Sequence, residues 1–228
     1  WVVNCVSSSH GGAEDYRRVY LQGAQNLIAW LAKTPPAKFV YTSSTGVYGQ
    51  NDGTLVDETS PTDPPTETSR VLAETERVFL AAAREQNFPA VVLRVAGIYG
   101  PGRSWYLKQF LAGEARIEGE GRRTLNMIHC DDVAGCIIAA LERGRPGEIY
   151  NAVDDAPVAQ RDFFAWLAAK LSRPLPPAIA EAAETLRKRG VTNKRISNHK
   201  LKTELGYAFR YPTFREGYVG LITAPAPR

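Results

Sequence analysis

Residues 38–49 read KFVYTSSTGVYG, and this stretch determines how the rest of the chain is interpreted. Phe39, Val40 and Tyr41 are β-branched or aromatic residues that follow two prolines, so they predict a short buried strand. Hydroxyl residues, 42–45, come directly after it. Ligands of open α/β sheets bind beyond the carboxyl ends of parallel strands, which places these hydroxyls at the rim of a predicted active site. The alternative is that they only cap a turn, as Ser and Thr often do after strands.

The segments before this stretch predict a strand and a helix. Residues 1–6, WVVNCV, are a nearly continuous apolar run that predicts a central parallel strand, and SSSHGG after them predicts a loop. Apolar residues recur at intervals of three and four over 15–33, which predicts an amphipathic helix. Strand, helix and strand in this order form a βαβ unit with a right-handed crossover.

The segments after it repeat the pattern and then change character. A helix is predicted over 69–85, a buried strand over 90–95, and short strands over 125–128 and 148–151. Asp131 and Asp132 are the expected caps of a helix that follows the strand predicted at 125–128. Further helices are predicted over 161–171, 178–188 and 198–205, with Ser197 as a cap and Gly206 as a terminator, so the C-terminal part is expected to be a small helical lobe.

Composition narrows the classes of function. The 228 residues are 44% hydrophobic and 23% charged, with a net charge of +4, which is typical of a globular protein that binds an anionic small ligand. No basic stripe interleaved with aromatic residues is present, so nucleic acid is not an expected partner. The three cysteines match no zinc or redox motif, and no metal is expected. No apolar run reaches 18 residues and no signal peptide is recognisable, so neither membrane insertion nor secretion is expected, and a cytoplasmic protein is predicted.

Five segments together resemble the extended short-chain dehydrogenase/reductase superfamily, in the branch that contains NAD-dependent sugar epimerases and dehydratases. They are YTSSTGVYG at 41–49, VDETSP at 56–61, LRVAGIYGPGR at 93–103, NMIHCDDVAG at 126–135 and EIYNAVDD at 148–155. The resemblance implies an α/β fold: a Rossmann-like, doubly wound parallel sheet with a smaller, mainly helical C-terminal lobe. It assigns 1–98 and 125–150 to the NAD(P)-binding domain, and 99–124 and 151–228 to the substrate lobe.

The resemblance also implies a cofactor, NAD or NADP. The glycine-rich turn that cradles the cofactor pyrophosphate belongs to the first strand of such a domain, and this sequence contains no such turn. The chain begins at Trp1 rather than Met, in the middle of a pattern. We therefore expect the intact protein to carry that strand, turn and helix before Trp1.

The family's catalytic residues are only partly matched. Family members use a Ser or Thr beyond the strand, which falls on Ser44, and a Tyr followed four residues later by a Lys. The segment PPTETSRVLAE aligns Thr66 with the Tyr and Arg70 with the Lys. Thr66 cannot titrate near neutral pH and Arg70 does not give up its proton, so the usual acid/base pair is replaced.

Other positions receive roles from the same resemblance. Ser43, Arg94 and Val95 are expected to contact the cofactor, and Arg70 either binds its ribose hydroxyls or pairs with Glu74 on the helix surface. Substrate contacts are expected from Thr45, Arg103 and His129. Arg103 is equally well interpreted as a surface residue, and His129 as a structural histidine before a helix cap.

Two functions follow from this pattern. The first is an NAD(P)-dependent oxidoreductase, epimerase or dehydratase that acts on a nucleotide sugar or a related small molecule, with a homodimer as the candidate assembly. The second is a non-catalytic dinucleotide-binding module that serves as a redox sensor or an assembly partner. Thr66 and Arg70 favour the second function, whereas Ser44 and the intact substrate-lobe pattern favour the first.

Overall fold

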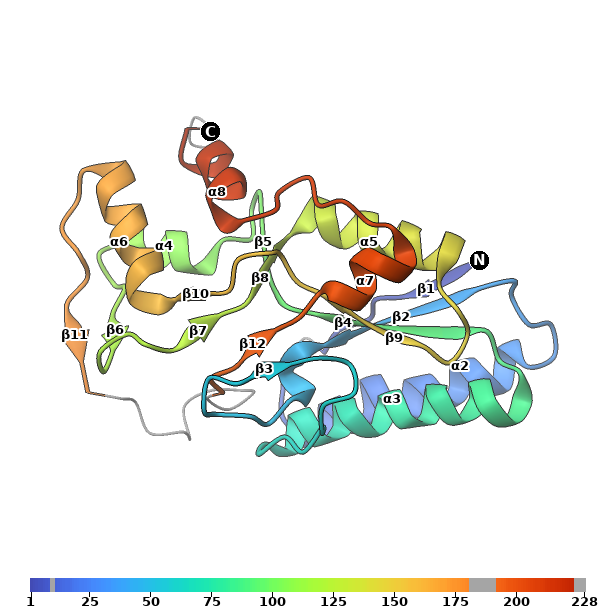
Figure 1. Cartoon of the computed structure of the whole chain (residues 1–228). Coiled ribbons are helices and arrows are strands. Elements are labelled where there is room, and N and C mark those ends of the chain that lie inside the picture. Colours follow the sequence, from blue (N-terminus) through green and yellow to red (C-terminus); the bar gives the residue numbers. More distant parts are fainter. Residues whose placement is uncertain (9–10, 181–191, 224–228) are drawn as a thin grey trace.

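A four-stranded parallel sheet forms the centre of the protein in the computed structural model, which describes residues 1–8, 11–180 and 192–223 (Figure 1). The strands lie in the order β1-β2-β4-β9. In register, Val3 lies opposite Val40 and Val40 lies opposite Val91. Their bounds are Val2–Asn4 for β1, Phe39–Ser44 for β2, Ala90–Val95 for β4 and Ile149–Ala152 for β9.

Helices cover both faces of this sheet, which explains why β2 and β4 are apolar at nearly every position. Phe39, Tyr41 and Val92 pack in one buried cluster with the helices on one face, while Val40 and Leu93 belong to the cluster on the other face. Figure 1 shows α2 and α3 on one side of the sheet and α5 and α7 on the other. The helices are α1 (Ala13–Tyr16), a π-helical segment η1 (Arg17–Gln22), α2 (Gly23–Leu31), α3 (Glu67–Gln86), α5 (Cys130–Arg143) and α7 (His199–Leu205).

The first strand differs from the prediction. A central strand is predicted at residues 1–6, whereas in the described part of the sheet β1 pairs only with β2 and lies at the edge. Val3 of this strand is correspondingly 38% exposed, whereas Asn4 is buried. The apolar run identifies a strand correctly, but apolarity does not specify how many neighbours the strand has.

A third buried cluster lies beyond the sheet and is built mainly from aromatic side chains, including Tyr99, Phe163, Phe214 and Tyr218. Two-stranded pairs connect the segments of this part: β5 (Gly97–Tyr99) with β8 (Met127–His129), β7 (Thr124–Leu125) with β10 (Val158–Ala159), β6 (Ile117–Glu118) with β11 (Ala178–Ile179), and β3 (Leu55–Val56) with β12 (Arg195–Ile196). The remaining helices are α4 (Trp105–Leu111), α6 (Gln160–Leu171), α8 (Phe214–Thr223) and the 3₁₀ turn η2 (Thr45–Val47).

Two local predictions are wrong at their boundaries. Helix α5 is capped by His129, whose ring accepts a hydrogen bond from the Asp131 backbone, rather than by Asp131 or Asp132, which lie inside the helix. Residues 178–179, predicted as the start of a helix, form strand β11 because they pair with β6, and residues 181–188 lie outside the described residues. Gly206 ends α7 in a left-handed conformation as predicted, with φ of 57°.

Candidate functional site

The site is organised around the hydroxyl turn at the end of β2. Strand β2 ends at Ser44, and its side-chain oxygen accepts a hydrogen bond from the Gly46 backbone at 3.1 Å, which starts the 3₁₀ turn. Ser44 therefore caps a turn, as one of the two interpretations of these hydroxyls predicts. This role does not exclude the other interpretation, a position at the rim of the active site. Ser43, Ser44 and Thr45 are each only 8% exposed, and all three line cavities at this end of the sheet.

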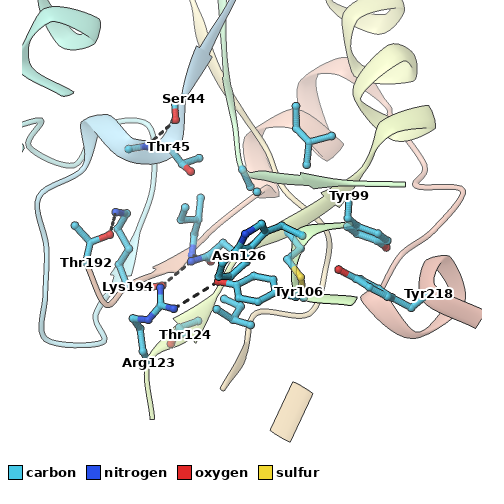
Figure 2. Close-up of a pocket in the computed structure, with 18 residues that line it drawn as sticks. Ser44, Thr45, Tyr99, Tyr106, Arg123, Thr124, Asn126, Thr192, Lys194 and Tyr218 are labelled. Atoms are coloured by element: carbon cyan, nitrogen blue, oxygen red, sulfur yellow. Dashed lines mark hydrogen bonds between the residues drawn. The ribbon is translucent and has the colours of Figure 1, made fainter. Parts of the chain in front are cut away.

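Two cavities meet at Ser44. The first, which we call the lobe cavity, has a volume of about 320 Å³ and lies between the hydroxyl turn and the aromatic lobe (Figure 2). Its polar lining includes Thr45, Tyr106, Arg123 and Lys194. The second, the strand-end cavity, has a volume of about 430 Å³ and lies at the carboxyl ends of β1, β2 and β4. The two cavities share Ser44 and residues 96–98.

A buried ion pair lies beneath the hydroxyl turn. The Arg94 guanidinium is 2.8 Å from a carboxylate oxygen of Glu76, and the same carboxylate accepts a hydrogen bond from Ser43 at 2.5 Å. Burial alone would lower the pKa of Arg94, but the adjacent Glu76 charge and its hydrogen bonds outweigh that effect and raise it. Arg94 also donates to the Tyr48 hydroxyl at 2.8 Å. This network holds β2 to α3, and Arg94 lines neither cavity.

The phenols around the site remain neutral near pH 7. Burial raises the pKa of Tyr48 to about 12, against the lowering effect of Arg94 beside it. Burial likewise raises the pKa of Tyr99 and of Tyr218, which both line the lobe cavity. Neutral phenols donate hydrogen bonds but do not accept protons, so these tyrosines are suited to binding rather than to general base catalysis.

The residues aligned with the family's Tyr and Lys have structural contacts. Thr66 caps α3, with its hydroxyl accepting a hydrogen bond from the Ser69 backbone at 3.3 Å. Arg70 is exposed and donates to the Pro65 carbonyl at 2.7 Å. Neither residue belongs to the lining of the two cavities. Helix α3 nevertheless packs against the η2 turn directly after Ser44, and Leu72 of this helix lines the strand-end cavity.

Of the remaining predicted residues, some reach the cavities and one does not. Ser43, Val95 and Arg103 line the strand-end cavity, and Thr45 lines the lobe cavity. His129 is buried against Tyr211, with ring centroids 3.9 Å apart, and its Nδ1 accepts the helix-capping hydrogen bond. Burial lowers the pKa of His129, which keeps the ring neutral near pH 7. Donor atoms of His129, Cys130 and Asp131 lie within 4.8 Å of one another, but the cap already uses the histidine nitrogen.

Sequence reasoning did not identify Lys194, Arg123, Tyr99 or Tyr218 as part of the site. Lys194 stands in the segment TNKRIS beside a second cation, a pattern that is usually a solvated surface. Its buried position depends on a contact with Tyr48, which lies 146 residues earlier in the chain. No local signal in the sequence indicates such a contact.

Asp154 lies two residues after β9, and its carboxyl group is buried. The protonation of this group is expected to make stability depend on pH. One of its oxygens accepts a hydrogen bond from the Ala156 backbone at 3.1 Å, and the other has no hydrogen-bond partner among the described residues. Burial raises the pKa of Asp154 from 3.8 to about 8. The unfolded chain therefore releases this proton near pH 4, whereas the folded protein retains it, and stability must fall as pH rises from about 4 to 8.

Asp154→Asn is expected to remove this pH dependence. At pH 7.5 the variant should have a free energy of unfolding higher than the wild type by on the order of 1–3 kcal/mol, and the difference should shrink toward pH 4. Urea denaturation at a series of pH values measures it. The exposed neighbour Asp155, which pairs with Lys202, provides the control, and Asp155→Asn should change stability by less than about 1 kcal/mol. A difference between Asp154→Asn and wild type that does not vary with pH would contradict the assignment.

Comparisons with known proteins identify the family and the fold. A model of the NAD dependent epimerase/dehydratase family matches residues 2–152. Protein YeeZ of Escherichia coli (strain K12) is 35% identical over 197 residues, which cover 85% of this chain and 65% of YeeZ. Human dTDP-D-glucose 4,6-dehydratase is 31% identical over 156 residues, which cover 64% of this chain and 44% of that protein. The chain thus spans less than two thirds of the length of these curated relatives.

Solved structures show the same fold. A functionally unknown conserved protein from Silicibacter pomeroyi DSS is 33% identical, with a TM-score of 0.80 over 96% of this chain and 76% of that chain. The dTDP-glucose 4,6-dehydratase DesIV from Streptomyces venezuelae, solved with NAD and TYD bound, is 24% identical, with a TM-score of 0.82 over 96% of this chain and 70% of that chain. Among the described residues, no helix has the length and apolarity needed to cross a membrane.

Proposed function

The chain belongs to the NAD dependent epimerase/dehydratase family, and from this membership we propose that it binds NAD in the strand-end cavity and acts on a nucleotide sugar or a related small molecule in the lobe cavity. The observation that supports this most directly is that both cavities meet at Ser44. A hydride can pass between cofactor and substrate only when the two are in contact. Two cavities that share lining residues would hold the cofactor and the substrate side by side. Structures of related fold solved with NAD, such as DesIV, make NAD the cofactor to test first.

The strand-end cavity has a lining that fits one end of a dinucleotide. It lies at the carboxyl ends of parallel strands, where such ligands bind in doubly wound sheets. Its lining combines apolar side chains with the hydroxyls of Thr42 and Ser43, includes one cation, Arg103, and contains no acidic residue among the described positions. Thr42, Ser43 and Arg103 would contact polar groups of the cofactor, and Val95 would contact its apolar face. The cofactor, when bound, supplies the hydride chemistry.

On the substrate side, this chain's own residues position the reacting group. Ser44 lies where the two cavities meet, so its side chain is placed to contact a substrate oxygen next to the cofactor. Tyr99 and Tyr218 provide neutral hydrogen-bond donors, and Tyr106 adds an aromatic face. With Thr66 and Arg70 at the Tyr and Lys positions, proton transfer lacks its usual acid/base pair. We therefore expect slower turnover of ordinary nucleotide sugars than in family members that have Tyr and Lys, by about 10²- to 10⁴-fold.

The test combines cofactor binding with turnover. Calorimetry on the protein should detect NAD binding, and Ser44→Ala should lower turnover of dTDP-glucose or UDP-glucose by about 10²-fold or more without weakening NAD binding by more than a few-fold. Ser60→Ala is the matched control, because Ser60 lies outside both cavities and its hydroxyl contacts only Asp57 among the described residues.

Each outcome has a distinct meaning for the proposal. Absence of NAD binding would remove the cofactor assignment. Full turnover in Ser44→Ala would remove Ser44 from the site. Binding of NAD together with no turnover of any nucleotide sugar would favour the non-catalytic dinucleotide-binding module, which the helix-capping role of Thr66 also fits.

A further inference from the structure

Asp132 is a buried carboxylate that binds a distant segment of the chain. It is the third residue of α5 and is 0% exposed. Its Oδ1 accepts hydrogen bonds from the Tyr207 hydroxyl at 2.8 Å and from the Arg210 backbone at 2.7 Å, and its Oδ2 accepts one from the Tyr211 backbone at 2.9 Å. Hydrogen bonds to a carboxylate are stronger than those between neutral groups. We call residues 207–213, which this carboxylate holds against α5, the clasp.

The start of α5 is shaped to receive the clasp. Gly135 lies three residues after Asp132, and a Cβ atom at this position would lie 2.1 Å from the Tyr207 hydroxyl oxygen. The phenol therefore reaches Asp132 only because position 135 has no side chain. Further along the clasp, the Tyr211 ring lies against the ring of His129, the cap of α5, with centroids 3.9 Å apart. Contacts from the first turns of α5 thus fix the clasp at several points.

The clasp leads directly into one wall of the lobe cavity. Helix α8 follows it immediately and carries Tyr218, whose ring stacks on Tyr99 with centroids 4.6 Å apart. Gly217 brings α8 against Tyr99, because a Cβ atom there would lie 2.3 Å from the Tyr99 hydroxyl oxygen. That hydroxyl donates to the carbonyl of Thr213, the last residue of the clasp, at 3.4 Å. Tyr99 and Tyr218 both line the lobe cavity, at the end away from the hydroxyl turn (Figure 2). We call these two rings the tyrosine wall.

We propose that Asp132 is a positioning residue for the lobe cavity. By holding the clasp, it sets the place of α8 and of the tyrosine wall, and so determines how tightly a ligand binds in the cavity. The inference rests on the proposed function, because it places the substrate there. Asp132 is not among the described lining residues of either cavity, so its effect on a ligand must pass through the clasp.

The first measurement needs no ligand. Hydrogen–deuterium exchange followed by mass spectrometry reports how firmly the backbone of residues 207–223 is held. Asp132→Asn replaces an acceptor oxygen by an NH₂ group, so exchange in this segment should become about 10- to 100-fold faster, while exchange in α3 should not change. Asp162→Asn is the matched control, because Asp162 is also the third residue of its helix, α6, but is exposed. Unchanged exchange in residues 207–223 of Asp132→Asn would overturn the inference.

The second measurement is a double-mutant cycle on affinity, which separates positioning from a general effect on folding. Calorimetry gives the dissociation constant of UDP-glucose for wild type, Asp132→Asn, Tyr218→Leu and the double variant. Asp132→Asn should weaken binding by about 2- to 30-fold. It should have little further effect in the Tyr218→Leu background, because the wall that it positions is then already altered. NAD binding should stay within about twofold, since no residue of the clasp is among the described lining of the strand-end cavity.

Gly135→Ala tests the same contact without touching the carboxylate, and it serves if Asp132→Asn fails to fold. Replacing Gly by Ala inside a helix ordinarily favours the helix. Here the added methyl group would displace the Tyr207 phenol, so exchange in residues 207–223 should still become faster and UDP-glucose should bind more weakly. Gly23→Ala is the control, because a Cβ atom at this position of α2 would lie 4.0 Å from the Arg18 carbonyl oxygen, an ordinary contact.

The outcomes separate this inference from the proposed function. Faster exchange, together with a loss of UDP-glucose affinity that Tyr218→Leu abolishes, supports the inference. Equal losses of affinity in both backgrounds would mean that Asp132 only stabilises the fold, and would overturn it. A wild-type protein that binds no UDP-glucose would contradict the proposed function, and the exchange data would then decide by themselves whether Asp132 holds the tyrosine wall.

Discussion

Exchanging Thr66 for Tyr together with Arg70 for Lys is expected to raise turnover of nucleotide sugars by about 10²- to 10⁴-fold. A Tyr without a nearby Lys keeps a pKa near 10, and a Lys without the Tyr has no phenol to activate, so either change alone should do little. The two positions lie four residues apart at the start of α3, on one helix face. Helix α3 packs against the turn after Ser44, so the assay tests whether the restored pair reaches that hydroxyl.

The assay compares wild type, both single variants and the double variant, with cofactor absorbance as the readout. Thr66→Tyr also removes a helix cap, which costs about 1 kcal/mol, so folding must be checked by thermal denaturation. Arg77→Tyr with Ala81→Lys, at the same spacing further along α3, is the control and should not raise turnover. A double variant that is folded and binds NAD, yet is as inactive as wild type, would show that the cavity is not built for this chemistry.

Arg94→Met is expected to lower the free energy of unfolding by about 3–5 kcal/mol. The change removes the ion pair at 2.8 Å. It leaves the buried Glu76 carboxylate with one hydrogen bond from the described residues, donated by the Ser43 hydroxyl. It also removes the guanidinium that donates to the Tyr48 hydroxyl and lies over the Tyr48 ring. Both effects act at the junction of β2, β4 and α3, directly beneath the hydroxyl turn. Urea denaturation followed by circular dichroism measures the loss.

Two controls show that burial causes this effect. The double variant Glu76→Leu with Arg94→Met removes both charges and should recover most of the lost stability, since replacing a buried pair by apolar residues is often neutral. The ion pair between Arg17 and Glu67 has the same 2.8 Å distance but is exposed, so Arg17→Met should cost less than about 1 kcal/mol. A loss of under about 1 kcal/mol for Arg94→Met would contradict the importance of this pair.

Part of the site was predictable from local sequence. The β-branched and aromatic residues 39–41 predict a strand, and the hydroxyls after it predict a rim position, because ligands bind where parallel strands end. Ser44 lies at that rim, between two cavities. The helix cap at His129 was not predictable in the same way. Asp is a common cap, and the sequence offers two Asp residues, but α5 begins at Cys130, so both lie inside the helix and the ring of His129 accepts the capping hydrogen bond.

The sequence by itself determined the four strands of the central sheet, the main helices and the family pattern, because residue periodicity and β-branched content act within a few neighbouring residues. The tertiary structure alone decided which cations are buried and which are paired. Arg94 meets Glu76 from another element, and Lys194 reaches a carbonyl 146 residues away without meeting a described carboxylate. Burial and pairing depend on contacts between distant segments. A lysine that looks like a solvated surface residue in TNKRIS therefore becomes a buried cation in the lining of the lobe cavity only once the chain is folded.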